Sequence, residues 1–406
     1  MLRRISTARL IVTVFAVVAF IAAVTAVTAL ALDGNGPRPP ARGLAAAIHD
    51  ALAGGPVSGM SADITFTDRL IGSTSTGAGA GTGVGASSPL LTGASGRLWV
   101  SADGQARLEL QSSRGDTEIS LSRDAVTLYD VATNTLYEWA LPTATASGAT
   151  GASGSQPDQL PTVATIESAL EKLMGTADLS GAEPTNIGGA PAYSVTISPK
   201  HPAGLLGEAR LGWDAMHGMP LDVAIYASGD STPVLELKVT SLSFGRVSPG
   251  AFAITPPASA RVVRIAPPAT PSAGSGSPGR IVEATGVAGV SAALPFTLDA
   301  PATLAGLSRG RVMLIGLNGQ HAALALYGDG LGSIAVVELQ AGSTQHPSGG
   351  IVGALGSLPR VQVNGVGASE LATALGTAVE FTRDGIDYVV AGFVAPAAVE
   401  AVARGL

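Results

Sequence analysis

The sequence predicts a mainly β protein, in which a large, curled antiparallel sheet is closed by helices and followed by a small α+β domain. From Trp99 to Phe252, short segments alternate apolar and polar residues with a period of two, the pattern of strands with one buried and one wet face. Tight polar turns such as Arg114–Asp116 and Thr133–Asn134 join them, so neighbouring strands must be antiparallel. A sheet of this many strands tends to curl, and two helical segments can cover one side of it.

Two helices are expected in this first domain. The first covers Arg42–Leu52, because Leu44, Ile48 and Leu52 recur on one helical face and glycines follow at its end. The second covers Val163–Met174. Its apolar stripe consists of Ile166, Leu170, Leu173 and Met174.

Strands of the first domain are expected both before and after the second helix. A single strand is expected at Ser61–Leu70 and a run of hairpins at Arg97–Leu141. Further strands are expected at Ala192–Ile197, Ala209–Trp213, Leu221–Ala227 and Val234–Phe244. Alternation along these strands places one apolar set of side chains on the inner face.

The second domain mixes strands and helices. Its expected strands are Arg311–Leu317, His321–Tyr327, Ile334–Leu339, Arg360–Val363, Ala378–Thr382 and Asp387–Gly392. Its expected helices are Ala368–Leu375 and Pro396–Arg404. Pro396 suits a first helical turn, and Asp384–Gly385 is a turn signal.

The N-terminal segment predicts export. Arg3 and Arg4 precede an apolar stretch, Leu10–Leu32, that would span roughly 34 Å as a helix and so cover a bilayer core. Ala29–Ala31 fits the small-x-small pattern of a cleavage site. Residues 1–32 are therefore either a cleaved signal peptide or a retained membrane anchor, and in both cases the body of the protein is extracytoplasmic.

Low-complexity stretches divide the rest of the chain. Gly72–Ser88 and Thr143–Gln159 are read as long loops within one domain, because strands of the same style resume after each. The Pro-, Ser- and Gly-rich stretch at 264–280 is read as a linker between domains, since the pattern changes after it. The predicted domains are thus 41–263, the curled sheet with its helices, and 281–406, a small α+β domain.

Charge and composition exclude several classes of function. The net charge is -7, and without the three N-terminal arginines the body has 20 basic against 30 acidic residues, which argues against nucleic-acid binding. The chain has no cysteine, so it has no disulfide, thiolate metal site or cysteine nucleophile. A lipid-modified N-terminal cysteine is excluded for the same reason.

No pattern of catalytic residues is found, so we expect no enzyme, cofactor or metal. The histidines are scattered, without the spacing of a metal site; they are His49, His201, His217, His321 and His346. The glycine pattern Gly81–Ala86 resembles a phosphate-binding loop but lies inside low complexity, with no strand before it. Asp384 and Asp387 flank a turn glycine and are read as solvated turn residues.

Several motifs of the first domain follow one another in a specific order. They are Gly115–Ile119, Tyr129–Asp130, Asn134–Tyr137, Pro191–Ile197, Leu211–Asp214, Gly218–Leu221, Leu242–Phe244, Phe252–Ile254 and Pro256–Pro257. Over 41–263 this order resembles LolA-like and RseB-like proteins, the periplasmic lipoprotein carrier fold. Val361–Gly365 and Gly385–Tyr388 resemble the small C-terminal module appended to LolA-like proteins of high-GC Gram-positive bacteria.

This resemblance implies an incomplete antiparallel barrel closed by helices, with an apolar interior that holds acyl chains. The apolar strand residues expected to line such a cavity are Trp99, Leu108, Leu110, Ile119, Leu121, Val126, Leu128, Trp139, Val195, Leu211, Trp213, Val223 and Leu237. For the three tryptophans, ordinary core packing stays an open alternative, because both roles need an apolar inward face.

Two functions follow as expectations. The first is non-enzymatic binding or carrying of lipid or lipoprotein acyl chains outside the cytoplasm, with a lipid or acylated lipoprotein as partner. The second is a membrane-tethered, RseB-like sensor or regulator that binds a membrane protein. Carriers have a single domain, whereas RseB-like sensors also have two, so the second domain keeps the second function open. Membrane association would come through the N-terminal segment.

Overall fold

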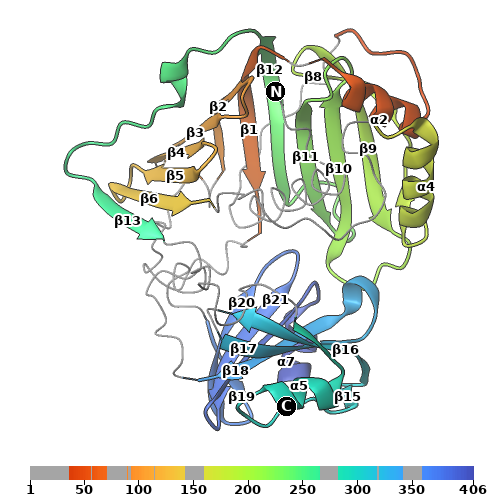
Figure 1. Cartoon of the computed structure of the whole chain (residues 1–406), viewed down its shortest axis with the longest axis vertical. Coiled ribbons are helices and arrows are strands. Elements are labelled where there is room, and N and C mark those ends of the chain that lie inside the picture. Colours follow the sequence, from red (N-terminus) through yellow and green to blue (C-terminus); the bar gives the residue numbers. More distant parts are fainter. Residues whose placement is uncertain are drawn as a thin grey trace.

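The computed structural model describes residues 36–55, 57–70, 89, 93–113, 115–141, 160–265, 282–317, 320–341 and 359–406. The predicted N-terminal segment, the loops at 72–88 and 143–159, the glycine pattern at 81–86, His346 and most of the predicted linker lie outside these residues. Figure 1 shows two sheets, one above the other, with helices beside each. No helix within the described ranges is both long and apolar enough to span a bilayer.

The first sheet has thirteen strands. Twelve of them are ordered β13-β6-β5-β4-β3-β2-β1-β12-β11-β10-β9-β7, and β8 also pairs with β9. The strands before the second helix are β1 (Gly59–Asp68), β2 (Ala94–Ser101), β3 (Ala106–Ser112), β4 (Gly115–Leu121), β5 (Ala125–Asp130) and β6 (Thr135–Ala140). Those after it are β7 (Ala177–Leu179), β8 (Glu183–Ile187), β9 (Ala190–Pro199), β10 (Leu206–Asp214), β11 (Pro220–Ala227), β12 (Leu235–Phe244) and β13 (Arg261–Ile265).

The curled, mainly antiparallel sheet predicted from the sequence is confirmed. The predicted run of hairpins is β2 to β6, and each of these strands pairs antiparallel with the next. Asn134, in a predicted turn, has a φ of 48°, a left-handed conformation that asparagine tolerates. The strands β7, β8 and β13 were not predicted from the sequence. Among the described strand pairs, only that of β13 with β6 is parallel.

Two helices pack beside this sheet, as predicted. They are α2 (Leu44–Ala53), with Gly54 at its C-terminal cap, and α4 (Val163–Leu173). The Thr162 side chain caps α4 by accepting the N–H of Thr165 at 3.2 Å. Only part of the predicted stripe of α4 is covered, because Ile166 is buried while Leu173 and Met174 are exposed. In Figure 1, α2 and α4 lie together at the β9 side of the sheet.

Gly96 lets β2 and β3 approach closely, so a larger side chain at this position should destabilise the sheet. A Cβ at Gly96 would lie 1.8 Å from the carbonyl oxygen of Glu109, so Gly96→Ala must force the strands apart. We expect a loss of about 2 kcal/mol or more in the free energy of unfolding, the usual scale of overpacking, measured by urea denaturation.

The matched control is Gly367→Ala. Gly367 also lies in a strand, and a Cβ there would meet nothing within 4 Å, so its effect should stay within about 0.5 kcal/mol. Equal losses in the two variants would show that close approach at Gly96 is unimportant.

The second sheet has nine strands, eight of them ordered β14-β16-β17-β18-β22-β21-β20-β19, with β15 paired to β16. Its strands are β14 (Val282–Thr285), β15 (Thr303–Leu304), β16 (Leu307–Leu317), β17 (Gln320–Tyr327), β18 (Ile334–Gln340), β19 (Arg360–Val363), β20 (Val366–Ala372), β21 (Thr377–Arg383) and β22 (Ile386–Gly392). Helices α5 (Val287–Ala293) and α7 (Pro396–Arg404) pack against it and share one core with it.

The helix predicted at Ala368–Leu375 is wrong, because this segment forms most of β20. Its alanine, glutamate and leucine content favours a helix, but pairing with both β19 and β21 overrides that preference. The missed signal is Asn364–Gly365, whose φ angles of 49° and 82° make the two-residue turn between β19 and β20. All six strands predicted in the second domain, and the helix at Pro396, are confirmed.

A junction cluster joins the two sheets. We define it as Leu70, Val234, Leu235 and Leu375 with the partly buried Leu206, Ile225, Ala227 and Ala374 around them. Two backbone hydrogen bonds cross beside it: Ala374 N–H donates to Leu70 O at 2.8 Å, and Leu205 N–H donates to Phe393 O at 2.6 Å. The turn between β20 and β21 therefore packs against the ends of β10, β11 and β12.

Candidate ligand-binding face

One side of the first sheet is apolar over most of its width. Pairing carries the same face from Leu211 on β10 to Val223 on β11 and Leu237 on β12. It continues to Phe66 on β1 and, through the hairpins, reaches Tyr137 on β6. We call this side the apolar face. Its residues on β3 to β6 form the hairpin part.

Twelve of the thirteen predicted cavity residues lie on the apolar face. Strand register places them there together, although the strands are far apart in the sequence. They are Leu108, Leu110, Ile119, Leu121, Val126, Leu128, Trp139, Val195, Leu211, Trp213, Val223 and Leu237.

Trp99 is the exception and requires a correction. Leu98 and Val100 belong to the cluster on the apolar face, so Trp99 between them projects from the opposite face. There, the guanidinium of Arg107 lies 5.8 Å from its ring centroid. Trp99 is therefore removed from the set of candidate ligand contacts.

Helix α2 covers one end of the apolar face. Ala47, Leu44 and Ile48 of the helix pack in one cluster with apolar-face residues of β9 and β10. The rings of Tyr193 and Trp213 lie 6.0 Å apart in this cluster. The members that had been predicted as cavity residues, Val195, Leu211 and Trp213, thus contact α2 and serve core packing.

The hairpin part changes from buried to accessible along its strands. Leu110 and Leu128 are buried, whereas Leu121 at the end of β4 is 39% exposed. Trp139 is partly buried and stacks on Tyr137, with ring centroids 6.0 Å apart. This accessible rim of aliphatic and aromatic side chains is the part of the face best placed to receive a further apolar molecule.

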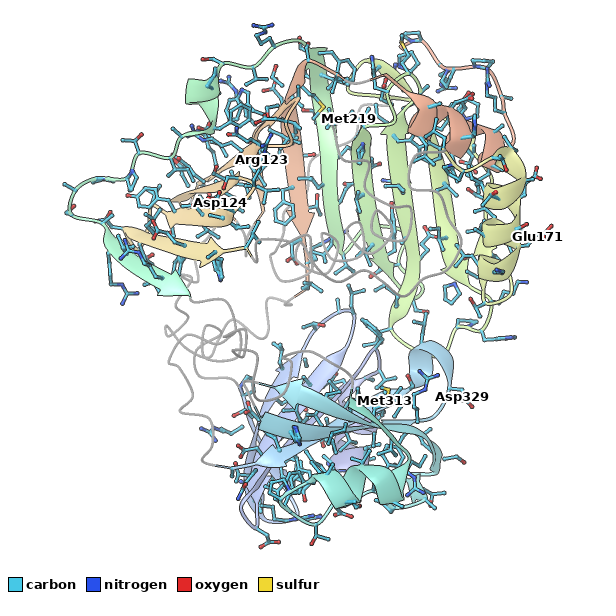
Figure 2. All side chains as sticks on the ribbon, in the orientation of Figure 1. Arg123, Asp124, Glu171, Met219, Met313 and Asp329 are labelled. Carbon is cyan, nitrogen blue, oxygen red and sulfur yellow. The ribbon has the colours of Figure 1, made fainter. Side chains whose placement is uncertain are left out.

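Further apolar-face residues lie on β1 and β6 and were not predicted from the sequence. Met60, Ile64 and Phe66 of β1 are buried in the same cluster, and their alternation along the strand could have identified them. Tyr137 lies two residues before Trp139 in the same strand, so the period of two would have placed both rings on one face. Met219, in the loop before β11, also packs against this cluster and is labelled in Figure 2.

The opposite face carries ion pairs with a structural role. Arg210 on β10 contacts Asp222 at 3.1 Å and Glu236 at 2.7 Å, and these side chains surround the buried Ala224 between them. Burial raises the pKa of both carboxyl groups, against the opposing effect of the Arg210 charge. The Arg210 guanidinium also lies 5.5 Å from the Tyr226 ring centroid.

The described residues hold no group of three or more histidine, cysteine or acidic side chains arranged for a metal. His217 does contact Asp214, with 2.9 Å between Nδ1 and Oδ2. The same carboxylate oxygen accepts the N–H groups of Met216 and His217, so Asp214 stabilises the turn between β10 and β11. Asp387 accepts a hydrogen bond from Thr382. Asp387 was expected to be a solvated turn residue but is buried. Local hydrogen bonds therefore account for the buried carboxylates of Asp214 and Asp387.

No protein-family model matches the chain, and no curated protein matches it. Among solved structures, the chain is similar to the MucA/MucB complex of Pseudomonas aeruginosa, at 15% identity over 89% of this chain and 97% of that chain, with a TM-score of 0.39. A separate MucB structure shows 13% identity over 89% and 96%, with a TM-score of 0.36. An outer membrane lipoprotein-sorting protein domain from Vibrio parahaemolyticus shows 11% identity over 52% and 95%, with a TM-score of 0.16. Likenesses at this distance assign no function to the chain.

Proposed function

We propose that this chain is an extracytoplasmic, non-enzymatic protein that binds the acyl chains of a lipid or an acylated lipoprotein on its apolar face. One observation carries the proposal: apart from one buried polar row at the far end of β4 to β6, the hairpin part is an apolar surface that ends in an accessible rim at Leu121 and Trp139. Each methylene group that such a surface removes from water contributes about 0.8 kcal/mol, so a long chain can bind without a reactive group.

In this proposal the half-barrel at 41–263 binds the acyl chain, and the domain at 281–406 packs against one end of the half-barrel and supports it. The junction cluster supports these separate roles of the two domains, because Leu375 of the second domain packs against Ile225 and Leu235, which belong to the apolar face. Strand β13 continues to Ile265, two residues beyond the proposed boundary. The N-terminal segment, 1–32, would direct export and either be cleaved or anchor the protein.

Native mass spectrometry of the full chain, exported by a bacterial host, tests the proposal. We expect co-purifying lipid, identified after extraction, or an added mass when the purified protein is incubated with a long-chain fatty acid. The control is the same protein with Trp139→Asp, which places a carboxylate on the rim and should reduce the bound fraction. Protein that carries no lipid and gains none on incubation would refute lipid binding.

Strand β13 favours a second candidate function, a membrane-tethered regulator that binds a partner protein. Among the described strands it lies at the edge of the sheet, and its Val262 is exposed. An edge strand offers free backbone groups to an extended segment of another protein. Affinity capture with the full chain from membranes should then recover a membrane protein, and Val262→Pro should abolish that capture. Capture that is unaffected by Val262→Pro would exclude this edge as the binding surface.

A further inference from the structure

A row of polar side chains crosses the otherwise apolar face on β4, β5 and β6. Thr117 pairs with Asp130 across β4 and β5, and Asp130 pairs with Thr135 across β5 and β6, so the three side chains are neighbours on the same face. Thr117 and Asp130 are 0% exposed and Thr135 is 1% exposed. The next row along these strands is apolar and contains Ile119 and Leu128.

The hydrogen bonds of this row are incomplete. Asp130 Oδ1 accepts the backbone N–H groups of Ala132 at 2.9 Å and Thr133 at 3.4 Å. Thr135 Oγ1 donates to Thr133 O at 3.0 Å. In contrast, Asp130 Oδ2 and Thr117 Oγ1 are buried and have no hydrogen-bond partner in the part of the chain that the structure describes.

Two buried, unpartnered polar atoms on neighbouring residues indicate a place where a ligand could donate hydrogen bonds. A buried carboxylate oxygen or hydroxyl without a partner is costly, and native proteins contain few of them. A carboxylate oxygen can only accept a hydrogen bond, and a threonine hydroxyl can accept one as well. The group that would satisfy both atoms therefore carries O–H or N–H donors.

We propose that Thr117 and Asp130 bind a hydrogen-bond-donating group, a hydroxyl or an ammonium, carried by the amphipathic molecule whose chain lies on the apolar face. This inference rests on the proposed function and adds the chemistry of the polar group. Thr117 and Leu121 lie four residues apart on β4, about 14 Å at the rise of a strand. The chain lies along Ile119 toward the accessible rim. Because Thr117 and Asp130 are fully buried without ligand, the donor group meets Asp130 Oδ2 only after the side chains around this row move apart.

Four compounds with the same twelve-carbon chain test the donor. Dodecanol and dodecylamine carry donors, whereas dodecyl methyl ether has none and dodecyltrimethylammonium keeps the charge without an N–H. Binding to the full chain is measured by displacement of a fluorescent fatty acid. We expect at least tenfold tighter binding of dodecanol than of its ether, or of dodecylamine than of its trimethylated form. The pair that shows the preference identifies the donor as a hydroxyl or an ammonium.

Two variants locate the preference. Asp130→Asn keeps an oxygen for the N–H groups of Ala132 and Thr133 but replaces the free acceptor, and Thr117→Val removes the hydroxyl at nearly constant shape. Each should reduce the tenfold preference to less than threefold. The matched control is Thr127→Val, because Thr127 lies on β5 one residue from Leu128 and projects from the opposite face.

A measurement without ligand completes the test. If the Thr117 hydroxyl has no protein partner, Thr117→Val should leave the melting temperature unchanged or raise it; a clear decrease would overturn the proposal. Equal binding of the capped and uncapped compounds by the unaltered protein, or a full preference retained in Asp130→Asn, would overturn it while leaving acyl-chain binding intact. Absence of binding by all four compounds would overturn both this proposal and the proposed function.

Discussion

Replacement of Leu121 by glutamate is expected to weaken acyl-chain binding at least tenfold without unfolding the protein. Leu121 is 39% exposed at the rim of the hairpin part, so a carboxylate there stays in water when no ligand is bound. A chain that covers this position must remove the carboxylate from water and also loses contact with a leucine. Covering the exposed part of Leu121 contributes only about 0.6–1.2 kcal/mol, a fraction of the value for a fully exposed leucine, so desolvation of the carboxylate supplies the rest of the loss; each 1.4 kcal/mol changes an affinity about tenfold.

Displacement of a fluorescent fatty acid measures this effect, and Val262→Glu is the matched control. Val262 is 45% exposed, and its pairing with Leu136 places it on the opposite face. The control should retain the affinity of the unaltered protein within about twofold, the scale of a surface substitution. If both variants lose binding equally, the effect comes from net charge and not from the apolar face.

Stability is expected to fall as the pH rises from about 4 to about 8, because two buried carboxyl groups retain their protons in the folded protein. Burial raises the pKa of Asp68 to about 8, although the N–H of Leu70 opposes this shift. Burial likewise raises the pKa of Glu338 to about 7, opposed by a hydrogen bond from the N–H of Asp299. Asp68 Oδ2 and Glu338 Oε1 have no partner among the described residues.

The sign follows from proton linkage. Between the ordinary pKa of each group and its raised value, the folded protein binds a proton that the unfolded chain has released, so the free energy of unfolding decreases with pH. Each group contributes a slope of up to about 1.4 kcal/mol per pH unit in its window. For Glu338 the decrease ends near pH 7, and for Asp68 it ends near pH 8.

Urea denaturation at pH 5, 6, 7 and 8 measures the slope. Asp68→Asn and Glu338→Gln remove the titrating groups while keeping an oxygen for the N–H of Leu70 and of Asp299, so each variant should flatten its part of the profile. Asp63→Asn is the control, because the Asp63 side chain is largely exposed. A stability that is constant from pH 5 to pH 8 in the unaltered protein would contradict the prediction.

The predictable part of the fold is the part encoded in short segments of the sequence. The strands β2 to β6 follow directly from alternation and from turns such as Thr133–Asn134. β20 was missed because its composition favours a helix and its strand state depends on pairing with β19 and β21. β13 was missed because it is short and pairs with β6, which lies far away in the sequence.

For the candidate site, alternation was sufficient to place most residues on one face but not to say what covers them. Trp99 was misassigned because a rare aromatic residue in a strand with aliphatic neighbours was expected on the inner face, whereas those neighbours, Leu98 and Val100, occupy that face. Trp213 contacts α2, a helix that begins at Leu44 and is therefore far from Trp213 in the sequence, so alternation along the strand did not reveal this contact. Thr117 and Asp130 become neighbours only through the register of β4 and β5, which residue types alone do not reveal.

The junction cluster has a consequence for how this protein can be divided. A fragment that ends at residue 265 would lose Leu375 and Ala374 and so expose Leu235 and Ile225 to water. It would also leave the carbonyl of Leu70 and the N–H of Leu205 without their present partners. Such a fragment should be prone to aggregate, and an intact chain should melt in one cooperative step. The boundary between the two sheets is thus a poor place to cut, despite the break in sequence pattern that marks it.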